Sequence, residues 1–116
     1  VWKYRNGTAD FDKTLAIEYT RNLYARQEIK GALGASHVKA QANLIDRSEQ
    51  LKKVKIPALI IHGEEDYLVD KFGGIETAEC IDGAKLVLIP KMGHIPFNKE
   101  LLERLEKEVV SFIVNY

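Results

Sequence analysis

Two apolar runs, each closed by a polar loop, constrain the fold of this chain more than any other feature. The runs are Ala58–His62 and Lys85–Ile89, and a helical pattern at Ile75–Ile81 lies between them. Strands that are apolar on both faces are typical of parallel sheets covered by helices. A strand, helix, strand crossover is almost always right-handed and joins parallel strands. We therefore expect both runs to end at the same edge of one sheet.

The residues upstream of these strands follow a helical pattern. From Asp12 onward, apolar residues recur every fourth position, and the glycines of 31–34 are typical of a helix end. A second helix is predicted from Ser36, packing through Val38, Ala42 and Ile45. Asp46 and Glu49 have the spacing of a capping box, which predicts a third, short helix. We thus divide the chain into a helical segment, 1–50, and a strand-helix-strand-helix part, 51–116.

A long amphipathic helix is predicted to close the chain. Asn98 is a favourable N-cap residue. The helical period places five apolar residues on one face, which we expect to pack on the sheet. They are Leu102, Leu105, Val109, Phe112 and Tyr116.

Composition excludes several classes of function. Lysine and arginine balance aspartate and glutamate at 17 each, so no net charge favours nucleic acid. The longest apolar run is far short of the roughly 20 residues that span a bilayer. A single cysteine, Cys80, favours a cytoplasmic location. The chain starts at Val1 and has one methionine, Met92, so we expect it to be processed or cut from a longer protein.

The loops that follow the two predicted strands carry a recognisable pair of motifs. The first reads His-Gly-Glu-Glu-Asp over 62–66, and the second reads Met-Gly-His over 92–94. With Ile-Asp-Gly-Ala-Lys-Leu at 81–86, this pattern resembles the C-terminal part of an α/β-hydrolase. It is most similar to the esterase branch that includes aclacinomycin methylesterase-like enzymes. The resemblance is close over 46–116 and weaker over the first 45 residues, which would form part of a helical cap.

The resemblance implies catalytic roles for Asp66 and His94. In this superfamily an imidazole removes the proton of a serine nucleophile, and a carboxylate holds the imidazole in its working tautomer. By position, Asp66 matches the carboxylate and His94 the base, and Gly93 is expected to permit a sharp turn that aims the ring. Asp70 is the alternative acid. Glu64 and Glu65 are interpreted as solvated.

The serine nucleophile is missing from the expected place. The superfamily carries it in a Gly-x-Ser-x-Gly elbow upstream of the acid and the histidine. The nearest match surrounds Ser36, but Val38 replaces the last glycine and no buried strand precedes it, so Ser36 is interpreted as a helix cap. Cys80 is interpreted as a packing residue. His62, Glu64 and His94 match no strong metal-binding spacing, so no metal or cofactor is expected.

These observations lead to one functional hypothesis with two rivals. The resemblance implies that the parent is a serine hydrolase acting on carboxylic esters of small molecules, and that this chain alone is inactive. A haloalkane or epoxide hydrolase with an aspartate nucleophile would use the same histidine, and a non-catalytic binding protein could retain the scaffold. Two strands make a poor sheet alone, so the chain is also expected to self-associate.

Overall fold

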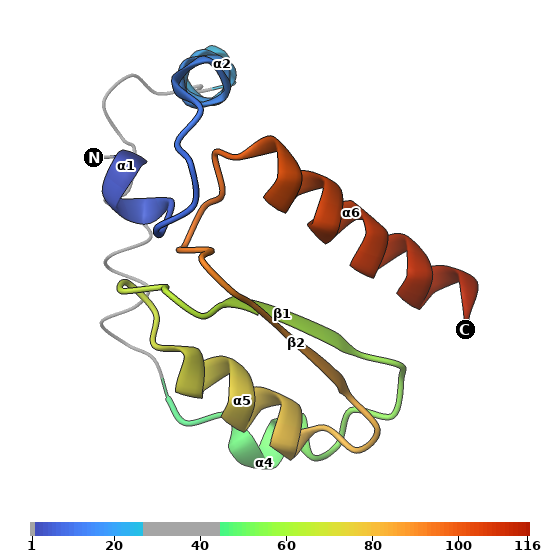
Figure 1. Ribbon diagram of the computed structural model, residues 1–116. Coiled ribbons are helices and arrows are strands. Elements are labelled where there is room, and N and C mark those ends of the chain that lie inside the picture. Colours follow the sequence, from blue (N-terminus) through green and yellow to red (C-terminus); the bar gives the residue numbers. More distant parts are fainter. Residues whose placement is uncertain (1, 27–44) are drawn as a thin grey trace.

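The computed structural model describes residues 2–26 and 45–116 of the chain (Figure 1). Its elements follow one another as a helical N-terminal part and an alternating C-terminal part. They are α1 (Trp2–Arg5), α2 (Lys13–Ala25), α4 (Ser48–Leu51), β1 (Leu59–Gly63), α5 (Lys71–Cys80), β2 (Lys85–Ile89) and α6 (Lys99–Val114).

The two strands pair in parallel, as the sequence predicts. Leu59 lies opposite Lys85 and the register continues without a break to Gly63 opposite Ile89. Strand β2 has the predicted bounds, whereas β1 begins and ends one residue later than expected. Both strands therefore end at the same edge, where the two polar loops begin.

Helices α5 and α6 lie on either side of the strand pair (Figure 1). Helix α5 begins at Lys71, four residues before the predicted start, because the Asp70 carboxylate accepts a hydrogen bond from the Phe72 amide at 2.9 Å and caps it. Helix α6 begins as predicted, with the Asn98 side chain accepting from the Leu101 amide at 3.0 Å.

The core lies between α6 and the ends of the strands. Ile89 is fully buried and contacts Met92 and Leu101. Ile61 and Val87, on the same face of the sheet, pack around this cluster. Burial of these side chains joins α6 to the edge from which the polar loops leave.

The predicted inward face of α6 is wrong at three of its five positions. Leu105 and Phe112 are half-buried as predicted, whereas Leu102, Val109 and Tyr116 are exposed. Leu101, which was not among the five, is buried instead. The helix carries two neighbouring apolar stripes, and helical periodicity alone cannot choose which one meets the sheet. The second stripe, formed by Val110, Ile113 and Val114, is left uncovered in the described part of the chain.

The N-terminal helices agree with the sequence prediction only in part. Helix α2 is capped by Asp12, whose carboxylate accepts from the amides of Thr14 and Leu15. Before α4, Asp46 accepts from Ser48, but Glu49 pairs with Lys52 instead of completing the capping box. The predicted helix end at 31–34 and the helix predicted from Ser36 lie outside the described residues, apart from Ile45, which is exposed.

Helices long and apolar enough to cross a membrane are absent from the residues that the structure describes.

Candidate active site

The loops after β1 and β2 are joined by backbone hydrogen bonds. The Glu64 amide donates to the Ile89 carbonyl at 3.0 Å, and the Glu65 amide donates to the Met92 carbonyl at 2.9 Å. Gly63 permits this approach, because a Cβ atom there would lie 2.3 Å from the Met92 carbonyl oxygen. The two loops therefore run side by side at one edge of the sheet.

This pairing brings Asp66 and His94 into contact. Asp66 Oδ2 lies 2.8 Å from His94 Nδ1. The other carboxylate oxygen, Oδ1, accepts from the amides of Leu68 at 2.9 Å and Val69 at 3.0 Å. The Asp66 side chain is only 6% exposed, against 37% for His94. The carboxylate is thus held on both oxygens, and the imidazole faces outward from it.

The electrostatics of Asp66 favour the ionised form. Burial raises the pKa of this carboxyl, but the Val69 amide, the His94 ring and the Leu68 amide outweigh burial and hold the pKa below its usual value. An ionised carboxylate only accepts hydrogen bonds, so His94 donates from Nδ1. Neutral His94 then carries its lone pair on Nε2, which is the atom that a general base needs.

A segment near the N-terminus holds the His94 loop from both sides. The Gly93 amide donates to the Asn6 carbonyl at 2.9 Å, and the Ile95 amide donates to the Arg5 carbonyl at 3.0 Å. The Phe97 amide donates to Asn6 Oδ1 at 2.6 Å. Asn6 is fully buried. His94 is therefore flanked by residues whose backbone positions are set by a segment about 90 residues earlier in the chain.

Two interpretations from the sequence are corrected at this junction. Gly93 was expected to permit a sharp turn, but the positive φ of this loop, 62°, belongs to Lys91. Gly93 is required instead for the close approach of two segments, since a Cβ atom there would lie 2.3 Å from the Arg5 carbonyl oxygen. Glu65 is not simply solvated, because it accepts from the Thr8 amide at 2.6 Å and hydroxyl at 2.8 Å. Glu64 is exposed as expected.

Sequence reasoning missed Asn6 as a structural part of the site. The pair Asn6-Gly7 is a turn signal, and Gly7 does adopt a positive φ of 84°. That signal predicts a turn, but it does not indicate which distant segment the turn contacts.

Replacing Asn6 by alanine is expected to lower the free energy of unfolding by about 2–4 kcal/mol, because the buried Phe97 amide and Ala9 carbonyl would lose their partners. Asn115→Ala is the matched control. Asn115 is exposed, so that change should cost less than about 0.5 kcal/mol. Urea unfolding measures both values, and equal midpoints for the two variants would contradict the role given to Asn6.

The remaining candidates from the sequence lie apart from the Asp66 and His94 pair. Asp70, the alternative acid, caps α5. Cys80 is half-buried at the end of that helix. Ser48 donates to Asp46, and Ser111 lies near the far end of α6. Ser36 lies outside the described residues.

The described residues contain no cluster of side chains that could bind a metal ion. Within residues 2–26 and 45–116, no three side chains of the His, Cys, Asp and Glu types converge as a metal site would require. His62 Nε2 instead lies 2.9 Å from the Val69 carbonyl oxygen, and Glu64 is exposed.

A cavity of about 670 Å³ opens beside His94. It lies between the N-terminal segment and the loop after β1. Its lining residues are Lys3, Tyr4, Arg5, Gly7, Thr8, Tyr67, Leu68 and His94. The outward face of the histidine thus meets a space large enough for a small molecule.

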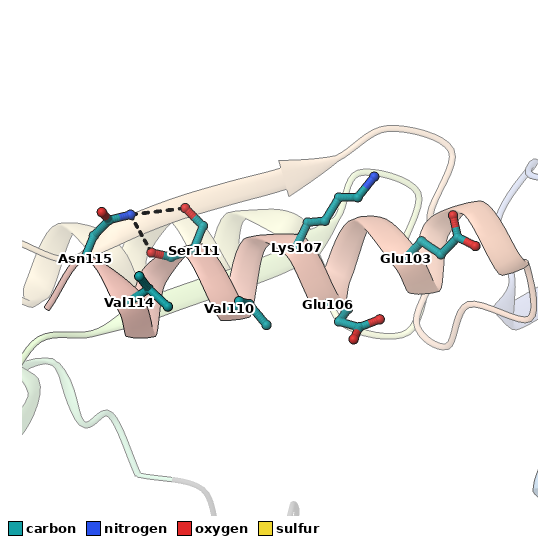
Figure 2. Close-up of a pocket in the computed structure, with 7 residues that line it drawn as sticks. All are labelled: Glu103, Glu106, Lys107, Val110, Ser111, Val114 and Asn115. Atoms are coloured by element: carbon teal, nitrogen blue, oxygen red, sulfur yellow. Dashed lines mark hydrogen bonds between the residues drawn. The ribbon is translucent and has the colours of Figure 1, made fainter.

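A second cavity, of about 720 Å³, lies along α6 (Figure 2). Val110 and Val114 line it on the C-terminal half of the helix, and Glu103, Glu106 and Lys107 line it nearer the N-terminal half. It contains neither Asp66 nor His94. We interpret it as part of the uncovered apolar stripe of α6 and not as a reaction site.

Known proteins share sequence with this chain over its C-terminal part. The bifunctional esterase/perhydrolase DCH of Acinetobacter calcoaceticus is 36% identical over 69 residues, which are 59% of this chain and 25% of that protein. The non-heme chloroperoxidase CPO-A1 of Kitasatospora aureofaciens is 36% identical over 72 residues, 53% of this chain and 26% of that protein. The chain thus spans about a quarter of the length of these curated relatives. No protein-family model matches it.

Solved structures share its fold. The serine hydrolase involved in carbazole degradation, CarC, superposes over 98% of this chain and 45% of its own, with a TM-score of 0.76 and 23% identity. The esterase RhEst1 from Rhodococcus sp. ECU1013 covers 60% of this chain and 25% of its own, with a TM-score of 0.55 and 28% identity. The described residues therefore form part of an α/β-hydrolase fold, with two parallel strands and flanking helices.

Proposed function

We propose that this chain supplies the acid and the base of a Ser-Asp-His triad in a serine hydrolase that acts on carboxylic esters of small molecules. Asp66 is the acid and His94 is the base. The observation that carries the proposal is the 2.8 Å contact between Asp66 Oδ2 and His94 Nδ1, made at the edge where both parallel strands end. Open α/β sheets bind their ligands at that edge.

The proposed reaction uses the free nitrogen of the imidazole. His94 Nε2 takes the proton of a serine hydroxyl as that oxygen attacks the ester carbonyl, and then returns the proton to the departing alcohol oxygen. Water then attacks the carbonyl of the acyl-serine while His94 Nε2 takes its proton, and return of that proton to the serine oxygen releases the carboxylic acid. Asp66 stabilises the imidazolium and keeps a hydrogen atom on Nδ1 throughout.

The serine is proposed to come from an upstream segment of a longer parent protein. The relatives are about four times as long as their matched regions, and the chain order of this fold places the serine before the acid. The helical segment 1–50 is proposed to belong to a cap and residues 51–116 to the hydrolase core. Membership of the aclacinomycin methylesterase-like branch and a cytoplasmic location are part of the same proposal.

The names of two relatives favour a second acceptor for the acyl group. One is called a perhydrolase and another a chloroperoxidase. If hydrogen peroxide instead of water gives its proton to His94 Nε2 and attacks the acyl-serine, the product is a peracid instead of a carboxylic acid. Aspartate-nucleophile hydrolases and non-catalytic binding proteins stay as rivals. An upstream Gly-x-Ser-x-Gly sequence supports the serine hydrolase, whereas an aspartate at that elbow, or no elbow, supports one of the rivals.

A fluorophosphonate probe tests the proposal directly, because it reacts with an activated serine. We expect the full-length protein to be labelled and the 116-residue chain to remain unlabelled, since neither Ser48, which donates to the Asp46 carboxylate, nor Ser111 has an imidazole beside it among the described residues. Peptide mapping should locate the label upstream of Val1. Labelling within the 116 residues would contradict the proposal.

Self-association of the 116-residue chain is also proposed. Each strand has one unpaired edge in the described sheet, and the second stripe of α6 exposes Val110 by 51%, Ile113 by 66% and Val114 by 76%. Multi-angle light scattering should show a mass above that of one chain.

Changing Val110 and Val114 together to lysine should lower this mass toward that of a monomer. Glu79→Lys, at an exposed position on α5, changes the net charge by the same amount and should have little effect. A mass equal to that of one chain for the unmodified protein at high concentration would contradict self-association.

A further inference from the structure

We propose that His62 is a positioning residue of this active site, which sets the shape of the 66–69 loop and thereby aims Asp66 at His94. The inference rests on the proposed function and goes beyond it, because the proposed triad gives His62 no role. Its basis is a chain of contacts that runs from α5 through the His62 ring and Val69 to the Asp66 carboxylate.

The His62 ring is seated against α5. His62 follows Ile61 in β1, so its side chain points to the opposite face from the core cluster, toward α5. Gly74 of α5 is buried there, and a Cβ atom on it would lie 2.9 Å from His62 Nδ1. The side chain of His62 is only 13% exposed. Helix and strand together therefore define the position of the ring.

From this position the ring holds Val69. His62 Nε2 lies 2.9 Å from the Val69 carbonyl oxygen, and a carbonyl only accepts, so Nε2 carries the hydrogen. The amide of the same residue donates to Asp66 Oδ1 at 3.0 Å. Val69 is thus fixed on one side by His62 and on the other by the acid.

The contact between His62 and Asp66 themselves is too long for a hydrogen bond. His62 Nε2 lies 3.6 Å from Asp66 Oδ2, against 2.8 Å for His94 Nδ1. Oδ2 is therefore left to His94, and His62 acts on the carboxylate through Val69. Without the Val69 bond the loop could turn, and the Asp66 carboxylate would lose the amide that orients it.

Two substitutions separate this role from simple packing. His62→Gln keeps a side-chain N–H of similar reach, whereas His62→Leu keeps bulk and removes the donor. In the full-length protein we expect His62→Leu to lower kcat by about 10- to 100-fold with little change in KM, because misplacing a catalytic group by about 1 Å is costly. His62→Gln should restore kcat to within a few-fold of the unmodified protein.

A second readout does not depend on activity. With ¹⁵N-labelled histidine, NMR of the full-length protein reports which ring nitrogen of His94 carries hydrogen. We expect Nδ1 in the unmodified protein and in His62→Gln, and a mixture of both tautomers in His62→Leu. If the protein is not a hydrolase, the kcat comparison fails while the tautomer comparison still decides the role of His62.

Gly74→Ala provides a variant that keeps the donor but displaces the ring. Alanine favours a helix more than glycine does, which offsets part of the cost of the tight contact, and the added methyl group must displace the His62 side chain, whose Nδ1 would lie 2.9 Å from it. The same tautomer mixture is expected. A single Nδ1 tautomer in both His62→Leu and Gly74→Ala, with unchanged kcat, would overturn the proposal.

Discussion

Replacing His94 by alanine in the full-length protein is expected to lower kcat by roughly three to six orders of magnitude, with a much smaller change in KM. The change removes the only histidine, among the described residues, that lines the cavity beside the loops. A serine hydroxyl without a base is a poor nucleophile, and the remaining rate would come from substrate binding and from groups outside this chain.

Steady-state kinetics with an aryl ester measures this loss. Added imidazole should recover part of the activity, since the cavity left by the ring is open to solvent at a position that is 37% exposed. Circular dichroism should remain that of the unmodified protein. Turnover close to the unmodified value would show that another residue is the base.

Changing Asp66 to asparagine is expected to lower kcat by about 10⁴-fold, and the geometry explains why. The amides of Leu68 and Val69 both donate to Oδ1, so the asparagine oxygen should stay there and its NH₂ group should face His94. That group donates, so His94 Nδ1 must accept and the hydrogen moves to Nε2. The ring then cannot take the proton of serine.

Asp70→Asn is the matched control for this experiment. Asparagine caps helices about as well as aspartate, so α5 should keep its start and kcat should stay within a few-fold of the unmodified value. Both variants remove one negative charge from the same loop. Equal losses in the two would mean that general electrostatics, and not the contact with His94, accounts for the effect.

Local pattern was sufficient to predict the two strands and the last helix of the C-terminal part, whereas α5 begins four residues before its predicted start. Strand β2 has its predicted bounds, and Asn98 caps α6, because apolar runs and capping side chains act over a few residues. The parallel crossover followed from the order of these elements alone. It also placed Asp66 and His94 at one edge of the sheet.

The order and spacing of residues were thus enough to predict the parallel strands and the edge that carries the acid and the imidazole. The sequence left Asp70 as an alternative acid, and packing excludes it, because the Leu68 and Val69 amides orient the Asp66 carboxylate toward His94 while α5 engages that of Asp70. Packing also sets which stripe of α6 is buried, and it brings Asn6 to accept a hydrogen bond from the Phe97 amide, 91 residues away in the chain. Such contacts depend on how distant segments pack, and no local period encodes that choice.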